Sequence, residues 1–148
     1  MTFSIGIDVG GTKILGGVVD SSGKVIHKIR AATPSAGGME LLDTIAEVSV
    51  SLAKFQKVEH IGLSIAGFVS ADRQRMLATP NISNLNDVEM AQYLSKSTGK
   101  KVVIENDGNA AAWGEYRFGA VQNSKSMLMV TLGTGIGGGI IVNGELLR

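Results

Sequence analysis

The chain has 148 residues, of which 44% are hydrophobic, so its length suggests about one domain that can bury a core and argues against a disordered segment. With 14 lysine and arginine residues against 13 aspartate and glutamate residues, the net charge is +1, and bulk charge gives no reason to expect nucleic acid or a membrane surface as a partner. Cysteine is absent, which excludes disulfides and cysteine-ligated metal within these residues.

The first third of the chain predicts three strands followed by a helix. Apolar, β-rich runs alternate with glycine or serine turns, which is the pattern of strands joined by hairpins. A helical periodicity of large aliphatic side chains follows them. The strands are expected at residues 3–9, 14–20 and 25–31, and the helix at residues 39–55. The apolar face of this helix consists of Leu41, Leu42, Ile45, Val48 and Leu52.

The middle of the chain predicts the order strand, helix, strand, helix. The first of these helices is suggested by Asn86 and Glu89, which resemble a capping box, and Gly99 ends it. The stretch 70–85 is polar and loop-like, and a loop of that length is a functional candidate. The four elements are expected at residues 60–65, 86–98, 101–105 and 107–116.

The last part of the chain predicts a new hairpin, with strands at 126–132 and 140–142 around a glycine turn. The polar stretch before it is the expected domain boundary, which gives a first domain at 1–120 and the start of a second at 121–148. The hairpin repeats the order of strand, Gly-Thr turn and strand found at the N-terminus, which suggests duplication of one unit. The expected fold class is therefore α/β, with a mixed sheet in βββαβαβα order and the first hairpin of a second, similar domain.

The turn D-V-G-G-T-K at residues 8–13 is the first candidate site. Its glycines permit close approach of the backbone, whose N–H groups can cradle a phosphate. Thr12 can add a hydroxyl donor, Lys13 a positive charge, and Asp8 could reach a magnesium ion or its water. An ordinary hairpin with a Gly-Gly turn would explain the same residues.

The second glycine turn contains G-x-G-x-x-G at Gly133, Gly135 and Gly138, which alone would suggest a dinucleotide site. We reject that interpretation, because a Rossmann fingerprint opens a helix whereas residues 140–142 continue as a strand. Two phosphate-type hairpins in one chain are better explained by a nucleotide clamped between two domains. The sequence contains no P-loop motif.

The third candidate is E-N-D-G-N-A-A-A at residues 105–112, where a strand ends and a helix begins. Asp107 there could accept the proton of a sugar hydroxyl that attacks a γ-phosphate, while Asn106 holds neighbouring hydroxyls in line. An alternative of equal weight is that one of the two merely caps the helix. Asn81 and the Gly67 turn, taken alone, are explained more readily as loop residues than as a site.

Five motifs in order resemble the ROK (repressor, ORF, kinase) sugar kinases: the three above, A-G-F-V at 66–69, and Pro80-Asn81. The resemblance covers essentially the whole chain and implies an actin-like ATPase (ribonuclease H-like) fold. It also implies a glucokinase activity that transfers the γ-phosphate of ATP to the 6-hydroxyl of glucose. The family often has Pro-Gly where this chain has Ala66-Gly67, which leaves the shape of that loop open.

The resemblance also assigns a role to individual positions. Asp107 would be the catalytic base, and Asp8 would bind Mg²⁺, directly or through water. The sugar would be bound by Gly67, Asn81, Asn106 and Asp107. ATP would be bound by Asp8, Gly10, Gly11, Thr12, Lys13, Thr134, Gly135 and Gly137.

Several features of the family are not found before Arg148, including its E-x-G-H segment and its cysteine-rich motif for a structural Zn²⁺. We therefore expect an N-terminal portion of such an enzyme, with no zinc ligands of its own, an unsupported last hairpin, and little or no kinase activity in isolation. Family resemblance implies a homodimer. No signal-peptide pattern or apolar run of membrane-spanning length is present, so the expected compartment is the cytoplasm.

Three other functions stay open. The first is a kinase of N-acetylmannosamine, N-acetylglucosamine or fructose, since the sequence encodes the identity of the sugar only weakly. The second is a sugar-sensing transcription regulator, which is disfavoured because such regulators resemble this chain only after an N-terminal helix-turn-helix, whereas here a strand is expected from Phe3. The third is a non-catalytic binding module.

Overall fold

The computed structural model describes residues 2–122, 124–133 and 135–148 of the chain. It divides into two compact units, Met1–Glu105 and Asn106–Arg148. None of the helices among these residues has both the length and the apolar character needed to cross a bilayer. Each unit is described by itself below.

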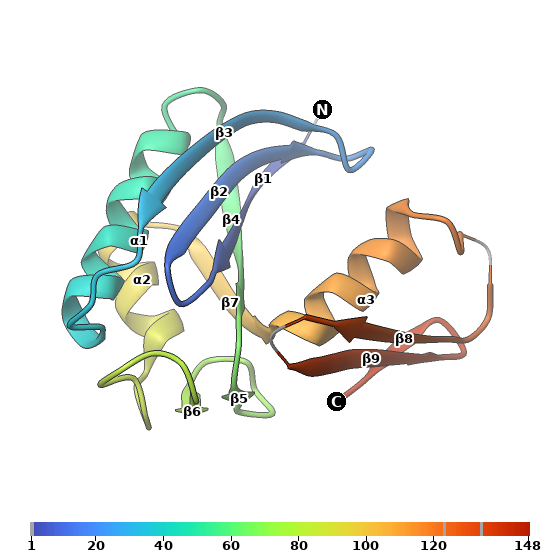
Figure 1. Ribbon diagram of the computed structural model, residues 1–148. Helices are drawn as coiled ribbons and strands as arrows, with labels where there is room; N and C mark the ends of the chain where they lie inside the picture. The colour runs from blue at the N-terminus through green and yellow to red at the C-terminus, as the bar shows by residue number, and fades with distance from the viewer. Residues whose placement is uncertain (1, 123, 134) are drawn as a thin grey trace. The chain divides into compact units, whose positions relative to one another are not determined.

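The first unit is built on a five-stranded mixed sheet (Figure 1). Its strands are β1 (Phe3–Val9), β2 (Lys13–Asp20), β3 (Val25–Ala32), β4 (Val58–Ile65) and β7 (Lys101–Asn106). They lie in the order β3-β2-β1-β4-β7, with β1 antiparallel to β2 and parallel to β4. Along β1 the side chains alternate between buried and exposed, as expected for a strand with one face in the core.

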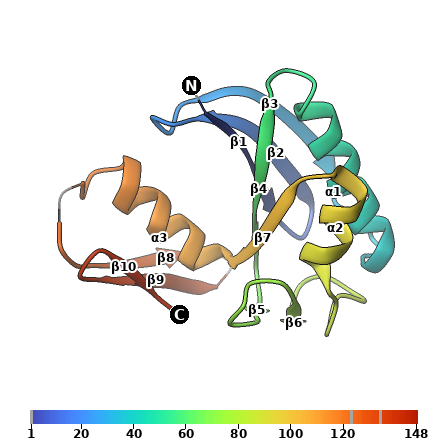
Figure 2. The same cartoon turned by 180° about the vertical axis from the view of Figure 1, so that it is seen from behind.

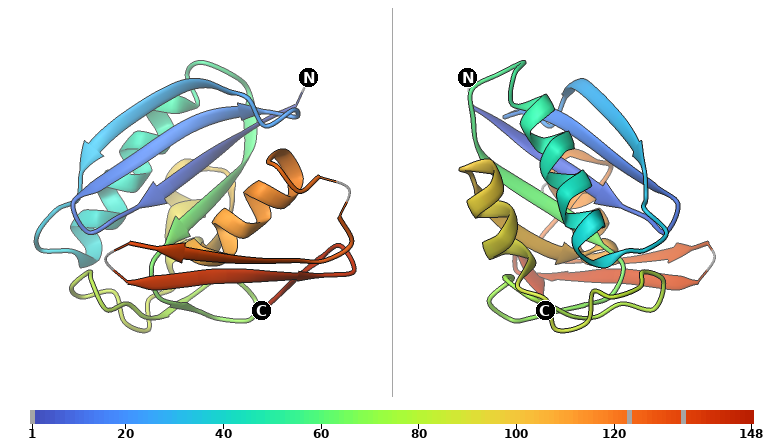
Figure 3. Two further views of the ribbon diagram at one scale, coloured as in Figure 1. Left: turned by 45° about the vertical axis from the view of Figure 1, so that its right-hand side comes forward. Right: turned by 90° about the vertical axis from the view of Figure 1, so that its left-hand side faces the viewer.

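Helices α1 (Gly38–Leu52) and α2 (Met90–Thr98) lie side by side on one face of this sheet (Figure 3). The predicted apolar face of α1 is confirmed, because all five of its predicted side chains are buried. The helix approaches β2 so closely that a Cβ atom at Gly16 would lie 2.7 Å from Leu52 Cδ1 and 2.8 Å from Val48 Cγ1. Apolar burial between α1 and the sheet therefore forms the centre of the core.

The stretch 70–85, predicted as one long loop, contains a short strand, β6 (Met76–Ala78), which pairs with β5 (Phe68–Val69) just before the stretch. The predicted capping box is wrong, since α2 begins at Met90 and its N-cap, Glu89, makes no side-chain cap bond. The reason is that the Asn86 carboxamide oxygen accepts a hydrogen bond from the Thr79 backbone N–H (3.2 Å). The Asn86 side chain thus accepts a hydrogen bond from a backbone N–H of a loop and does not cap the start of α2.

The second unit has a three-stranded antiparallel sheet with α3 (Asp107–Phe118) along one face (Figure 2). Its strands are β8 (Met127–Leu132), β9 (Ile136–Val142) and β10 (Glu145–Leu147), in the order β10-β9-β8. The strand β9 begins earlier than predicted, because its glycines pair with β8. The compact units do not coincide with the predicted division at 120 and 121, because α3 packs against β8 and β9.

The other face of the β8–β9 pair is apolar and exposed. Cross-strand pairing places Leu128 opposite Ile140 and Leu132 opposite Ile136. Leu132 is 81% exposed and Ile136 is 82% exposed. We call this the open face; its large side chains are Leu128, Val130, Leu132, Ile136, Ile140 and Val142.

Candidate functional site

Asp8 is exposed near the carboxyl end of β1, where the parallel register with β4 sets it opposite Ser64. The Ser64 hydroxyl donates a hydrogen bond to Asp8 Oδ1 (3.0 Å). This contact holds one carboxylate oxygen in place and leaves the group facing solvent. An exposed carboxylate of this kind has the oxygen chemistry that Mg²⁺ accepts while keeping most of its waters.

The turn after Asp8 is held by a residue that the sequence did not indicate. The Gly10 N–H donates to the Lys13 carbonyl (2.9 Å), which closes the turn. The Thr33 hydroxyl donates to the Gly10 carbonyl (2.7 Å), and the Thr33 N–H donates to the Thr12 carbonyl (3.1 Å). The turn joins the antiparallel strands β1 and β2, as the alternative of an ordinary hairpin also predicts, and neither Gly10 nor Gly11 has a positive φ. Gly11, Thr12 and Lys13 are exposed.

Gly67 and Asn81 lie in two loops of the first unit that the structure brings to the same end as this turn. Gly67 has φ 143°, and a Cβ atom there would lie 2.4 Å from the Ala78 carbonyl oxygen, so only glycine fits. The Asn81 carbonyl oxygen lies 3.7 Å from the position of a Cβ atom on Gly11. Among the described residues, the Thr79 hydroxyl between these loops is buried and without a hydrogen-bond partner.

Asn106 caps α3, as one of the two alternatives predicted. Its Oδ1 accepts a hydrogen bond from the Asn109 N–H (3.1 Å). Asp107 is the first residue of the helix, is exposed, and accepts from the Gly108 N–H through Oδ1 (2.9 Å). Capping by Asn106 therefore fixes the start of the helix, where the Asp107 carboxylate is exposed.

The second glycine segment lies in the second unit with α3. A Cβ atom at Gly108 would lie 2.6 Å from the Gly138 carbonyl oxygen, so the start of α3 touches β9 through two glycines. At the turn, the Gly133 N–H donates to the Gly135 carbonyl (2.9 Å), and a Cβ atom on either glycine would meet open space. Gly137 is exposed in β9, and Thr134 lies outside the described residues. The run continues as a strand, so rejection of the dinucleotide fingerprint is confirmed.

Sequence reasoning also missed Arg73 and Glu105, which form an ion pair with Arg73 Nε 3.4 Å from Glu105 Oε2. Glu105 is buried, and it directly precedes Asn106. The nearby Asp72 carboxylate accepts a hydrogen bond from the Ser70 hydroxyl, and this bond is the largest of the causes that lower the pKa of Asp72. No local pattern links residues so far apart along the chain.

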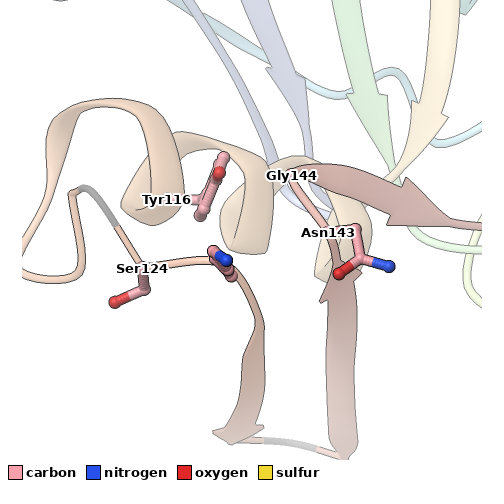
Figure 4. Close-up of a pocket in the computed structure, with 5 residues that line it drawn as sticks. Tyr116, Ser124, Asn143 and Gly144 are labelled. Carbon is pink, nitrogen blue, oxygen red and sulfur yellow. The ribbon is translucent and has the colours of Figure 1, made fainter.

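A pocket of about 370 Å³ lies elsewhere in the second unit (Figure 4). It is lined by Tyr116, Ser124, Lys125, Asn143 and Gly144. None of the predicted site residues that the structure describes lines it. Within the described ranges, no group of three or more histidine or acidic side chains is placed to hold a metal ion, so any Mg²⁺ would depend on Asp8 together with water or substrate oxygens.

Comparison with known proteins gives one family and two kinds of kinase. A model of the ROK family matches residues 4–148. The glucokinase of Streptomyces coelicolor is 37% identical over 148 residues, which are 100% of this chain and 46% of that protein. The N-acetylmannosamine kinase of Yersinia pseudotuberculosis is 35% identical over 144 residues, which are 97% of this chain and 48% of that protein.

One solved structure is similar over almost the whole chain. It is a ROK family glucokinase from Streptomyces griseus in complex with glucose and AMPPNP. The TM-score is 0.92 at 41% sequence identity, and the match covers 99% of this chain and 46% of that one. The mixed α/β sheet, of the actin-like type expected from the sequence, is thus shared with a solved sugar kinase. The chain spans about half the length of the relatives it matches.

Proposed function

The chain belongs to the ROK family, and we propose that it carries phosphate-binding and sugar-binding residues of an ATP-dependent kinase acting on the 6-hydroxyl of glucose. One observation carries this proposal beyond family membership. Each compact unit presents an exposed carboxylate beside a glycine segment: Asp8 before the Gly10–Gly11 turn, and Asp107 at the helix start that touches Gly138. Such pairs suit a reaction that needs a base, a metal ligand and backbone donors for phosphate.

In the proposed reaction, Asp107 accepts the proton of the sugar 6-hydroxyl as that oxygen attacks the γ-phosphorus. The new bond joins the sugar oxygen to phosphorus, the bond to the β–γ bridging oxygen breaks, and ADP leaves. Such general-base assistance contributes roughly 10²- to 10⁴-fold to the rate. Asn106, Asn81 and Gly67 would hold the sugar, so that the attacking oxygen stays in line.

The phosphate chain is assigned to backbone and side-chain donors. Gly10, Gly11, Thr12 and Lys13 would contact it from one turn, and the segment with Thr134, Gly135 and Gly137 from the other. Asp8 would hold Mg²⁺, which when bound neutralises charge on the phosphates. The exposed Asp8 carboxylate, anchored by Ser64, supports that assignment.

Glucose is the first substrate to test, because a 37% identical relative is a glucokinase. N-Acetylmannosamine is the second, because a 35% identical relative is an N-acetylmannosamine kinase. We also propose a homodimer for the active protein, by family resemblance.

The proposal is tested by coupled ADP release with Mg-ATP and a panel of hexoses, using this chain and any longer product of its reading frame. We expect turnover with a hexose by at least one of these proteins, and loss of most turnover in Asp107→Asn with sugar binding retained. Asp20→Asn is the matched control, because Asp20 accepts its hydrogen bonds at the end of β2 opposite the glycine turn. Absence of turnover with every hexose, or full turnover by Asp107→Asn, would refute the assignment.

A further inference from the structure

Arg73 makes three polar contacts with the last residues of β7. Its Nε lies 3.4 Å from Glu105 Oε2 and donates to the Ile104 carbonyl (3.4 Å). Its own carbonyl accepts a hydrogen bond from the Ile104 N–H (3.1 Å). Arg73, in the loop between β5 and β6, therefore contacts the N–H and the carbonyl of Ile104 and the side-chain carboxylate of Glu105.

The loop is built to hold Arg73 in an unusual conformation. Arg73 has φ 62°, in the left-handed region that non-glycine residues rarely adopt. The Ser70 carbonyl accepts from the Arg73 N–H (2.9 Å), and the Ser70 hydroxyl accepts from the Arg75 N–H (2.9 Å). The Gln74 carbonyl accepts from the Ala91 N–H (3.0 Å), which ties the loop to α2. Backbone strain that persists in this way is concentrated at functional positions.

The contacts of Arg73 lie at an edge of the five-stranded sheet. The strand β7 is the last in the order, and among the described strands its neighbour in the sheet is β4. Glu105 is 8% exposed, and a buried carboxylate needs a partner of opposite charge. Removal of the guanidinium of Arg73 would take away a charged contact of this carboxylate and, with it, a tie between the hairpin loop and the end of β7. Asn106 and Asp107 are the next two residues in the chain.

We propose that Arg73 is a positioning residue, which acts through Glu105 and Ile104 to hold the strand end from which Asn106 and Asp107 project. The expected effect on kcat rests on the proposed kinase function, whereas the expected effect on the backbone at the end of β7 does not. A small displacement of a reacting group costs a large factor in rate, because the catalytic group must meet the substrate in an aligned geometry. Arg73 would therefore influence the transition state more than the binding of nucleotide.

Arg75 supplies a matched control in the same loop. Its Nη1 lies 3.0 Å from Asp87 Oδ1 and its Nε lies 3.2 Å from Glu89 Oε1, and the three side chains are between 43% and 73% exposed. These contacts lead to the segment before α2, not to β7. Exposed ion pairs of this kind contribute little.

The structural arm of the test is hydrogen–deuterium exchange on this chain, following backbone amides of residues 104–108. We expect Arg73→Gln to raise their exchange rates roughly tenfold, because a charge-assisted contact is lost, while Arg75→Gln leaves them unchanged. Arg73→Lys keeps the charge but not the planar group and should fall between them. Unchanged exchange in both Arg73 variants would overturn the proposal, whatever the kinase assay shows.

The kinetic arm uses whichever protein turns over in the ADP-release assay. We expect Arg73→Gln to lower kcat roughly 10- to 100-fold with KM for Mg-ATP nearly unchanged, and Arg73→Lys to recover part of the loss. A lower Tm with unchanged kcat would show a purely structural role and overturn the proposal. If the unsubstituted protein lacks turnover with every hexose, the kinase function fails, and exchange alone decides whether Arg73 holds the strand end.

Discussion

The two compact units differ in how their sheets are covered. In the first, the exposed positions of the central strand β1 are Ser4, Gly6 and Asp8, so the side of this strand turned away from the core is small and polar. In the second, α3 packs against one face of the β8–β9 pair, and the open face is apolar as well. An apolar run on both faces of a strand is typical of sheets covered on both sides. The first unit therefore closes its own core, whereas the pattern of the second calls for a layer that the described residues do not supply.

The largest effect that tests this comparison is expected from a leucine in each unit. Leu41 is 0% exposed in α1 and Leu132 is 81% exposed on the open face. Leu41→Ala should lower the free energy of unfolding by about 2–5 kcal/mol, because it removes buried contacts and leaves a cavity. Leu132→Ala should change it by less than about 0.5 kcal/mol. Urea unfolding followed by circular dichroism measures both, and equal losses would show that the open face is covered in solution.

A smaller effect is expected where α3 meets β9. A Cβ atom at Gly139 would lie 2.6 Å from Ala112 Cβ, so Gly139→Ala must push the helix away from the strand. We expect a loss of about 1–3 kcal/mol in the stability of the second unit. The single tryptophan, Trp113, lies on α3 and reports this unit by fluorescence during unfolding. Gly135→Ala is the control, since its Cβ would meet nothing within 4 Å; a loss as large as that of Gly139→Ala would contradict the packing explanation.

The smallest expected effect is an increase in the stability of the second unit. Gly114 lies inside α3, and a Cβ atom there would meet nothing within 4 Å. Gly114→Ala should stabilise the second unit by about 0.5–1 kcal/mol, because alanine loses less backbone entropy in a helix. The measurement is again the fluorescence transition of Trp113. A transition that does not shift would mean that α3 is not the element limiting the stability of this unit.

Local patterns in the sequence were sufficient for the elements of the first unit but not for the contacts between them. The apolar face of α1 repeats every three or four residues, so five positions predicted it correctly. Asn86 and Glu89 had the spacing of a cap, but the partner of Asn86 is Thr79, in a loop whose path the spacing does not encode. Most of β7 was predicted from the sequence, whereas the contacts of Arg73 with Ile104 and Glu105 in this strand were not.

The candidate site shows the same division. Asp8, Asn106 and Asp107 were found because each stands where a strand ends, which is a local signal. The Thr33 hydroxyl supports the first glycine turn from 23 positions away in the sequence, and a threonine just after the end of a strand gives no sign of such a role. Gly138 and Gly139 were assigned only to a turn, whereas their lack of side chains lets α3 approach β9. Contacts of this kind follow from three-dimensional proximity, which no single-sequence pattern contains.

The parallel register of β1 and β4 has a consequence for assembly of the chain. Asp8 stands between Ile7 and Val9, whose side chains point to the opposite side of the sheet and are buried. A slip of β1 by one position would turn the carboxylate inward and both aliphatic neighbours outward, at a large energetic penalty. The alignment that excludes misfolded sheets is therefore the same alignment that brings Asp8 to the surface beside Ser64. A single strand register therefore determines both the correct burial of Ile7 and Val9 and the exposure of the Asp8 carboxylate.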